Sequence, residues 1–214
     1  RTVFRLGAEA FAGYMTEFAR EGVSLLGGCC GTTPAHVSAV ISAVRDIPIQ
    51  PPAQASASGI VLTSRSMAVH IGAGQPLRIL GERINPTGKK LVKQALLAGD
   101  MDYILKEGLS QQDKGAHVLD VNVGLPGLDE PVLLPALVER LVAAHPVALC
   151  LDSANVDALA EGLNAYPASA LVNSINGDEG RMERLGPLCR EYGAPFILLP
   201  LKGKQLPVAS ADRI

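Results

Sequence analysis

The sequence predicts an α/β protein made of fragments of two (β/α)8 TIM-type barrels, joined by a linker rich in Pro, Ala and Ser. Short apolar runs alternate with helical segments from residue 76 onward, which is the pattern of parallel βα units. Near the start, Cys29 and Cys30 follow a separate short apolar run. Between these regions, the stretch IPIQPPAQASASG has the composition of a linker.

Residues 1–46 are predicted to form the C-terminal end of the first barrel. Gly7–Arg20 has apolar residues at helical spacing, and Val23–Leu26 is predicted as a short strand. Pro34–Val44 is predicted as a helix with Thr33 as its N-cap. Residues 47–75 are assigned to the linker, with either a short strand or an extended segment over Ile60–Gln75.

Residues 76–214 are predicted to form the N-terminal part of a second barrel. Its expected strands are Leu77–Leu80, Val118–Val121, Val147–Leu151, Ala170–Val172 and Phe196–Leu199. Its expected helices are Leu91–Leu97, Asp102–Lys114, Pro131–Ala144, Val156–Leu163 and Arg181–Tyr192. The strand runs are apolar on both faces, as in a parallel sheet covered by helices. About five βα units are present where a closed barrel needs eight.

Composition excludes several classes of partner. The 214 residues have a formal net charge of −2 and no basic block, so no nucleic acid or anionic membrane is expected to bind. No apolar stretch is long enough for a transmembrane helix, and no signal peptide is visible. Four cysteines are too few for a disulfide scaffold, and Cys150 and Cys189 are predicted as buried core residues. A cytoplasmic protein is expected.

Both ends of the chain fall inside sequence with the pattern of structured elements. The chain begins at Arg1 and ends at Ile214, so we expect a piece of a longer polypeptide. An incomplete barrel leaves open sheet edges, which invite pairing with other chains. The piece alone is therefore expected to be inactive.

Polar side chains end four of the apolar runs. Asp120, Asp152 and Asn173 directly abut their predicted strands and are interpreted as functional, because chemistry gathers at the carboxyl ends of barrel strands. Asn155 and Asn176 are explained as well by capping and turns. A carboxylate can accept two parallel N–H donors from a 2-amino-4-oxo pyrimidine ring, and an amide both donates and accepts. These residues predict a rim that binds a heterocycle.

Four motifs resemble the pterin-binding domain of methyltetrahydrofolate methyltransferases, a (β/α)8 barrel similar to dihydropteroate synthase. They are GERINPTGKK (81–90), LDVNVG (119–124), LDSAN (151–155) and VNSINGDEG (172–180). The resemblance implies that Asp152 and Asn173 hold the pterin. Residues matching the family's first two strand motifs are further candidates, namely Glu82, Asn85, Asp120 and Asn122. A later Asp and a further Asn of the family's site would lie beyond Ile214, and no catalytic residue is assigned.

The segment GGCCGTTPAH (27–36) resembles the end of the homocysteine S-methyltransferase domain, which is also a (β/α)8 barrel. The resemblance implies that Cys29 and Cys30 bind zinc together with a third Cys outside this chain. Zinc with three thiolates keeps a fourth position open for a substrate and lowers the pKa of the thiols that bind it. A Cys-Cys pair alone is more often structural. His36 is assigned to a helix surface.

A homocysteine domain followed by a pterin domain is the order found in the cobalamin-dependent methionine synthases. This resemblance implies methyl transfer from 5-methyltetrahydrofolate through cob(I)alamin to zinc-bound homocysteine, which forms methionine. Cobalamin would be bound by another domain of the same longer polypeptide. Three alternatives stay open: a stand-alone methyltetrahydrofolate:corrinoid methyltransferase, a dihydropteroate synthase-like enzyme, and a non-catalytic folate-binding fragment.

Overall fold

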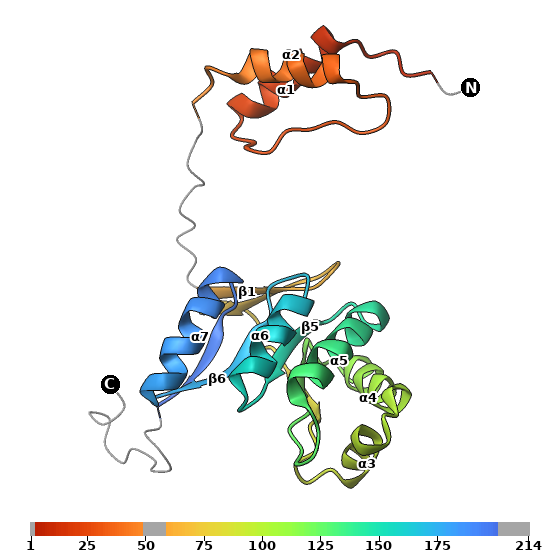
Figure 1. The fold of residues 1–214 in the computed structure, drawn as a ribbon, viewed down its shortest axis with the longest axis vertical. Helices are drawn as coiled ribbons and strands as arrows, with labels where there is room; N and C mark the ends of the chain where they lie inside the picture. Colours follow the sequence, from red (N-terminus) through yellow and green to blue (C-terminus); the bar gives the residue numbers. More distant parts are fainter. Residues whose placement is uncertain (1–2, 49–58, 201–214) are drawn as a thin grey trace. The chain divides into compact units, whose positions relative to one another are not determined.

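The computed structural model describes residues 3–48 and 59–200, within a chain that divides into two compact units, Arg1–Ser56 and Ala57–Ile214. The first unit consists of helices α1 (Ala8–Arg20) and α2 (Pro34–Val44), which pack against each other (Figure 1). The predicted start of α2 is confirmed, with Pro34 as its first residue and Thr33 as its N-cap. A fixed proline φ suits the first turn of a helix, where no N–H partner is needed.

The strand expected over Val23–Leu26 is wrong. These residues are irregular, and the part of the first unit that the structure describes contains no strand at all. A strand needs a neighbouring strand to satisfy its backbone N–H and C=O groups. With no such neighbour, Leu25 is left 91% exposed in a loop.

The second unit opens with an antiparallel hairpin of β1 (Gly59–Thr63) and β2 (Ala68–Gly72). The linker expected over residues 47–75 is therefore too long at its C-terminal end, because residues 59–72 are paired strands. Residues 49–58 of that expected linker lie outside the described part of the chain. The short-strand alternative for Ile60–Gln75 is the one that the structure supports.

A five-stranded parallel sheet follows, and it confirms the predicted α/β class. Its strands are β3 (Leu80–Ile84), β4 (Val118–Asn122), β5 (Ala148–Asp152), β6 (Leu171–Asn176) and β7 (Phe196–Leu199), adjacent in chain order. The helices are α3 (Lys90–Ala98), α4 (Met101–Asp113), α5 (Glu130–Ala144), α6 (Val156–Ala165) and α7 (Glu179–Glu191). The first strand begins at Leu80 instead of Leu77, and Leu77 is 87% exposed.

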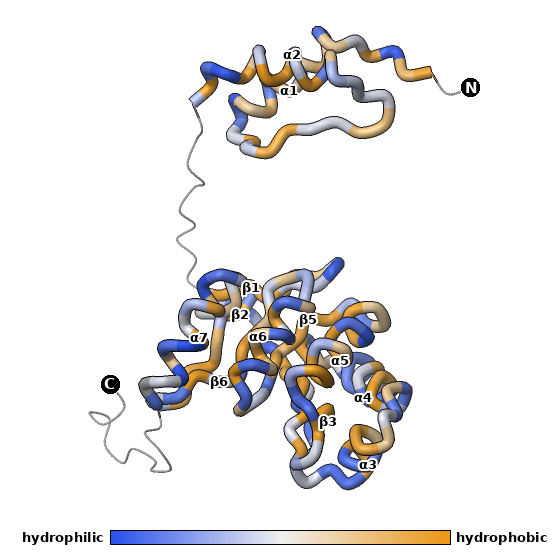
Figure 2. Tube along the Cα trace, viewed as in Figure 1, coloured by the Kyte–Doolittle hydropathy of each residue, from blue (hydrophilic) through white to orange (hydrophobic). Residues whose placement is uncertain are grey.

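The strands alternate between two apolar environments, as the period of two requires. Leu119, Val121, Leu149 and Leu151 belong to the larger core formed with the helices. In Figure 2 these helices alternate between orange and blue along the tube, as amphipathic helices do. On the opposite face of the sheet lies a second, smaller core, formed by Val118, Ala148, Cys150 and Leu171. Cys150 and Cys189 are both buried, as predicted.

The hairpin closes this second core. Leu62 and Val69 pack against the strand residues there and are 0% and 3% exposed. The Tyr166 hydroxyl donates to the carbonyl oxygen of Thr63 at 2.6 Å, and burial raises the pKa of Tyr166 to about 12. The backbone of Ser169 also pairs with Thr63. The hairpin is thus part of the second unit's core.

Replacing Leu62 with Ala should lower the free energy of unfolding of the second unit by about 2–5 kcal/mol, because it opens a cavity in a fully buried site. Urea denaturation of the full chain, followed by circular dichroism, measures this. Val61→Ala on the same strand is the matched control, since Val61 is 38% exposed and should change stability by no more than about 0.5 kcal/mol. Equal effects of both substitutions would show that the hairpin does not seal a core.

Candidate functional site

Three of the predicted site residues lie in one row across the parallel sheet. Asn122 of β4 is in register with Asp152 of β5, which is in register with Asn173 of β6. Residues in register on parallel strands point to the same face. Asp120 lies two residues before Asn122 and therefore on that face as well, one layer deeper.

Hydrogen bonds join these four residues in two pairs. Asn122 Nδ2 donates to Asp152 Oδ2 at 2.9 Å, and Asn173 Nδ2 donates to Asp120 Oδ1 at 3.2 Å. Asn122 Oδ1 in turn accepts the N–H of Gly124 at 2.8 Å. That bond fixes which end of the Asn122 amide faces the carboxylate, so each carboxylate has an amide donor aimed at it.

A cavity of about 380 Å³ opens over this row. Asp152 and Asn173 line it together with Ser153, Ala154, Ser174, Asn176, Asp178, Arg181 and Leu199. The volume lies within the range of small-molecule sites, and most of the lining residues are polar. The site can therefore hold a ring whose edge carries both donors and acceptors.

Burial raises the pKa of Asp152, and the nearby carboxylates of Asp120 and Glu130 raise it further. The hydrogen bond from Asn122 and the positive charge of Arg181 act in the opposite direction. Beneath Asp152, burial raises the pKa of the Cys150 thiol well above its ordinary value. Cys150 is therefore an uncharged core residue. The protonation of Asp152 therefore depends on the balance between burial, two neighbouring carboxylates, one amide donor and one positive charge.

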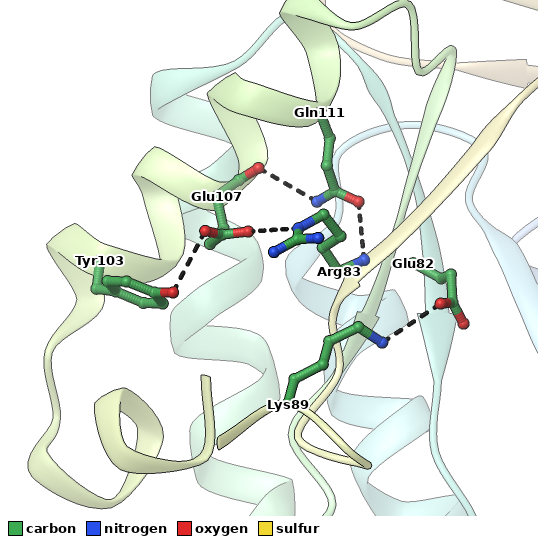
Figure 3. Close-up of polar contacts among 6 residues, drawn as sticks. All are labelled: Glu82, Arg83, Lys89, Tyr103, Glu107 and Gln111. Carbon is green, nitrogen blue, oxygen red and sulfur yellow. Dashed lines mark hydrogen bonds and ion pairs between the residues drawn. The ribbon is translucent and has the colours of Figure 1, made fainter. Parts of the chain in front are cut away.

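Glu82 and Asn85, the candidates from the first strand, do not join this group. The Glu82 side chain is 74% exposed and forms an ion pair with Lys89 at 3.3 Å (Figure 3). Asn85 Oδ1 accepts the N–H of Thr87 at 2.9 Å, which is a local turn contact. Among the residues described, neither lines the cavity.

The irregular pairing of β3 with β4 between Gly81 and Ile84 explains why the first strand differs. Figure 3 shows the Arg83 side chain reaching Glu107 of α4, where Nε and Oε2 are 2.9 Å apart. The Arg83 N–H, which the bulge frees from the ladder, donates to buried Gln111 Oε1 at 2.8 Å. A Cβ at Gly81 would lie 2.6 Å from this same oxygen, so a larger residue there would have to displace the Gln111 amide from its bond to Arg83.

The cysteine pair has the spacing of two ligands on one zinc ion. Cys29 Sγ and Cys30 Sγ are 3.8 Å apart, and both thiols are exposed. Two thiolates bound tetrahedrally at about 2.3 Å from zinc are about 3.8 Å from each other. Within residues 3–48 and 59–200, however, no three His, Cys, Asp or Glu side chains gather as a metal site. Within these residues the structure therefore shows the spacing of the two thiols and no complete metal site.

Both ring nitrogens of His36 have hydrogen-bond partners within the first unit. Its Nδ1 accepts the N–H of Thr33 at 3.3 Å, and its Nε2 lies 3.0 Å from the carbonyl oxygen of Leu6. The imidazole also meets Phe11 edge to face, with 5.7 Å between ring centroids. Its assignment to the helix surface stands, although it lines a cavity of about 250 Å³ together with both cysteines.

Comparisons with known families match both parts of the chain. Residues 81–211 match the family described as pterin binding enzyme, and residues 2–44 match the family described as homocysteine S-methyltransferase. The chain belongs to the pterin binding enzyme family. No helix in the described part of the chain has the length and apolar character to cross a membrane.

The relatives of this pterin binding chain include two mycobacterial methionine synthases. That of Mycobacterium tuberculosis is 35% identical over 199 residues, and that of Mycobacterium leprae is 32% identical over 211 residues. Each alignment covers 91% of this chain and 16% of the relative, so the chain spans about a sixth of their length. A crystal structure of dihydropteroate synthetase with product is 21% identical, with a TM-score of 0.47, and covers 71% of this chain and 55% of that one.

Sequence reasoning missed two residues that organise the rim of this cavity. Ser153 is buried and donates to Glu130 at 2.6 Å, and Arg181 donates to three backbone carbonyl groups. A signal for Arg181 was available. Arg181 lies in the first turn of α7, where the helix dipole disfavours a positive charge. An arginine at this position therefore indicates a role other than stabilising the helix.

Replacing Asp152 with Asn should stabilise the folded protein near neutral pH and have no such effect below about pH 4. The raised pKa of Asp152 means that the folded state prefers the protonated form. The contribution of protonated Asp152 to stability is present at low pH and is lost as pH rises through the pKa of the folded state. Asn carries no charge at any pH, so the variant does not lose stability in this way. Melting temperatures of the full chain between about pH 3 and 8 measure the difference. If the difference in melting temperature between Asp152→Asn and the wild type were the same at every pH in this range, the raised pKa of Asp152 would be wrong.

Proposed function

We propose that this chain supplies the pterin-binding region and part of the homocysteine-binding region of a methionine synthase. The pterin region would bind 5-methyltetrahydrofolate at the row formed by Asn122, Asp152 and Asn173. The observation that carries the proposal is this in-register row, which opens into a cavity of about 380 Å³. Its supports are the family membership and the similarity to methionine synthases.

The proposed role of the row is to hold the edge of the pterin ring. Ionised Asp152 would accept the parallel N–H donors of the 2-amino-4-oxo ring, because two carboxylate oxygens match two such donors. Asn173 would meet the same edge as a donor and an acceptor. Asp120 and Asn122 would act mainly through their hydrogen bonds to Asn173 and Asp152.

Ring binding alone does not release a methyl group, since an N-methyl amine is a poor leaving group. In the proposed reaction N5 would take up a proton, the N5–CH₃ bond would break with its electron pair left on nitrogen, and cob(I)alamin would supply the electron pair for the new bond to the methyl group. Fixing the ring edge would hold N5 and its methyl group in one place for attack, which is how positioning accelerates such a step. Cobalamin, bound by a further domain of the same polypeptide, would accept the methyl group.

The proposed role of Cys29 and Cys30 is to bind zinc, with a third thiolate from a part of the protein outside this chain. Their 3.8 Å spacing supports this role. Zinc at this place would bind homocysteine as a thiolate and raise its reactivity at neutral pH. The four free thiols also suit a reducing compartment, and a cytoplasmic location remains our proposal.

Replacing Asp152 with Ala should weaken binding of 5-methyltetrahydrofolate by about 10- to 100-fold, the effect of losing hydrogen bonds to a charged group. Asn173→Ala should act in the same direction. Calorimetric titration of the full chain measures both. Asp157→Ala is the matched control, because Asp157 is an exposed carboxylate of the same unit that pairs with Arg184. Unchanged affinity in Asp152→Ala would contradict the proposed role.

The full chain by itself should bind zinc only weakly, because two thiolates leave the ion under-coordinated. Competition with a chromophoric chelator measures the affinity. Replacing both Cys29 and Cys30 with Ser should abolish the weak binding, whereas replacing buried Cys189 with Ala should not change it. Stoichiometric zinc that survives the chelator would show that the ligand set is complete within this chain.

A further inference from the structure

Arg181 makes an unusual set of contacts for a residue in the first turn of a helix. Its guanidinium turns back toward the sheet, where Nε donates to the carbonyl oxygen of Ser174 at 2.8 Å. Nη1 donates to Ala154 and Nη2 to Ser153, each at 2.7 Å. One planar group therefore bonds the segment after Asp152 and the segment after Asn173 at the same time.

These bonds begin where the β-ladder stops. β5 and β6 are paired as far as Asp152 and Asn173, and the last backbone contact joins Ser153 N–H to the Asn173 carbonyl at 3.3 Å. Beyond this point the chain after β5 enters a loop, whereas β6 continues to Asn176 beside β7, so the two segments separate and their facing carbonyl groups need other donors. The guanidinium supplies charge-assisted donors in a rigid planar arrangement, which fixes the relative positions of its three acceptors.

We propose that Arg181 is a positioning residue of the pterin site, which ties the chain after Asp152 to the chain after Asn173 so that both side chains meet one ligand. This inference rests on the proposed function. Arg181 lines the same cavity as Asp152 and Asn173, so the tie is made at the site itself. The ladder sets the register of the two residues, and Arg181 joins the loop after β5 to the last part of β6, beyond the last pair of this ladder.

The charge of Arg181 gives this role a signature that a purely structural contact lacks. Asp152 faces Asp120 from β4, Glu130 from α5 and Arg181 from α7, in addition to the amide of Asn122. Arg181 is itself faced by Asp152 and Asp178. The carboxylates of Asp120 and Glu130 raise the pKa of Asp152, and the guanidinium of Arg181 lowers it. Removing the positive charge should therefore let Asp152 take up its proton at a higher pH.

The test compares Arg181→Met with Arg184→Met in the full chain. Arg184 lies on the same helix and forms only an exposed pair with Asp157, so it is the matched control. Affinity for 5-methyltetrahydrofolate is measured by calorimetry between about pH 5 and 8. We expect about tenfold weaker binding at pH 7 in Arg181→Met, and loss of binding at a higher pH than in the wild type. Arg184→Met should match the wild type.

Arg181→Lys separates charge from geometry and covers the case in which Arg181→Met does not fold. Lysine keeps the positive charge but lacks the planar fork, so the affinity should fall while the pH midpoint stays near that of the wild type. In an Asp152→Asn background, Arg181→Met should no longer shift the pH dependence, because the group that titrates is absent. A shift that persists there would overturn the inference.

A ligand-free measurement distinguishes failure of this inference from failure of the proposed function. Hydrogen exchange over residues 152–155 and 173–178 should be about tenfold faster in Arg181→Met than in Arg184→Met. The pKa of Asp152 in the ligand-free chain is measured by NMR titration. If the wild type does not bind 5-methyltetrahydrofolate, the proposed function is wrong. Hydrogen exchange and the Asp152 titration still decide the role of Arg181 in that case. Unchanged exchange and an unchanged Asp152 titration would overturn it.

Discussion

The structure depends most on the register of three parallel strands. Because side chains alternate along a strand, a slip of one residue in β5 would turn Asp152 from the cavity to the helix-covered face. The same slip would bring Leu151 out of the larger core. The hydrophobic pattern therefore holds the register, and the register brings Asn122, Asp152 and Asn173 into one row. The packing of the strands and the placement of this polar row are fixed by the same interaction.

The layer beneath this row sets its electrostatics. Cys150 and Leu171 are buried under Asp152 and Asn173, and Leu62 and Val69 of the hairpin close the layer below them. Asp120 lies in the same layer as Cys150 and Leu171. Burial is the main cause of the raised pKa of Asp152, and the charge of Asp120 raises it further.

The two units differ in how much of their own environment they build. The second unit has two hydrophobic cores, whereas Ala12 and Val40 are the only buried residues in the described part of the first. The two cysteine sulfurs of the first unit are nevertheless 3.8 Å apart, the distance between two thiolates on one zinc ion. A local turn is enough to set the distance between adjacent cysteines, whereas a row that spans three strands needs a whole sheet.

The sequence by itself determined most of the helices and strands of the parallel sheet and two of the polar residues that line its cavity. The bounds of α2 and β7 follow from local signals, and Asp152 and Asn173 were identifiable by residue type and place. Only the tertiary structure decided the rest, including the hairpin within the expected linker, the missing strand at Val23–Leu26 and the separation of Glu82 from the row. It also decided that Arg181 joins the loop after β5 to the last part of β6. These features depend on which strands are neighbours and where a ladder ends, and pairings between residues far apart in the chain leave no local pattern.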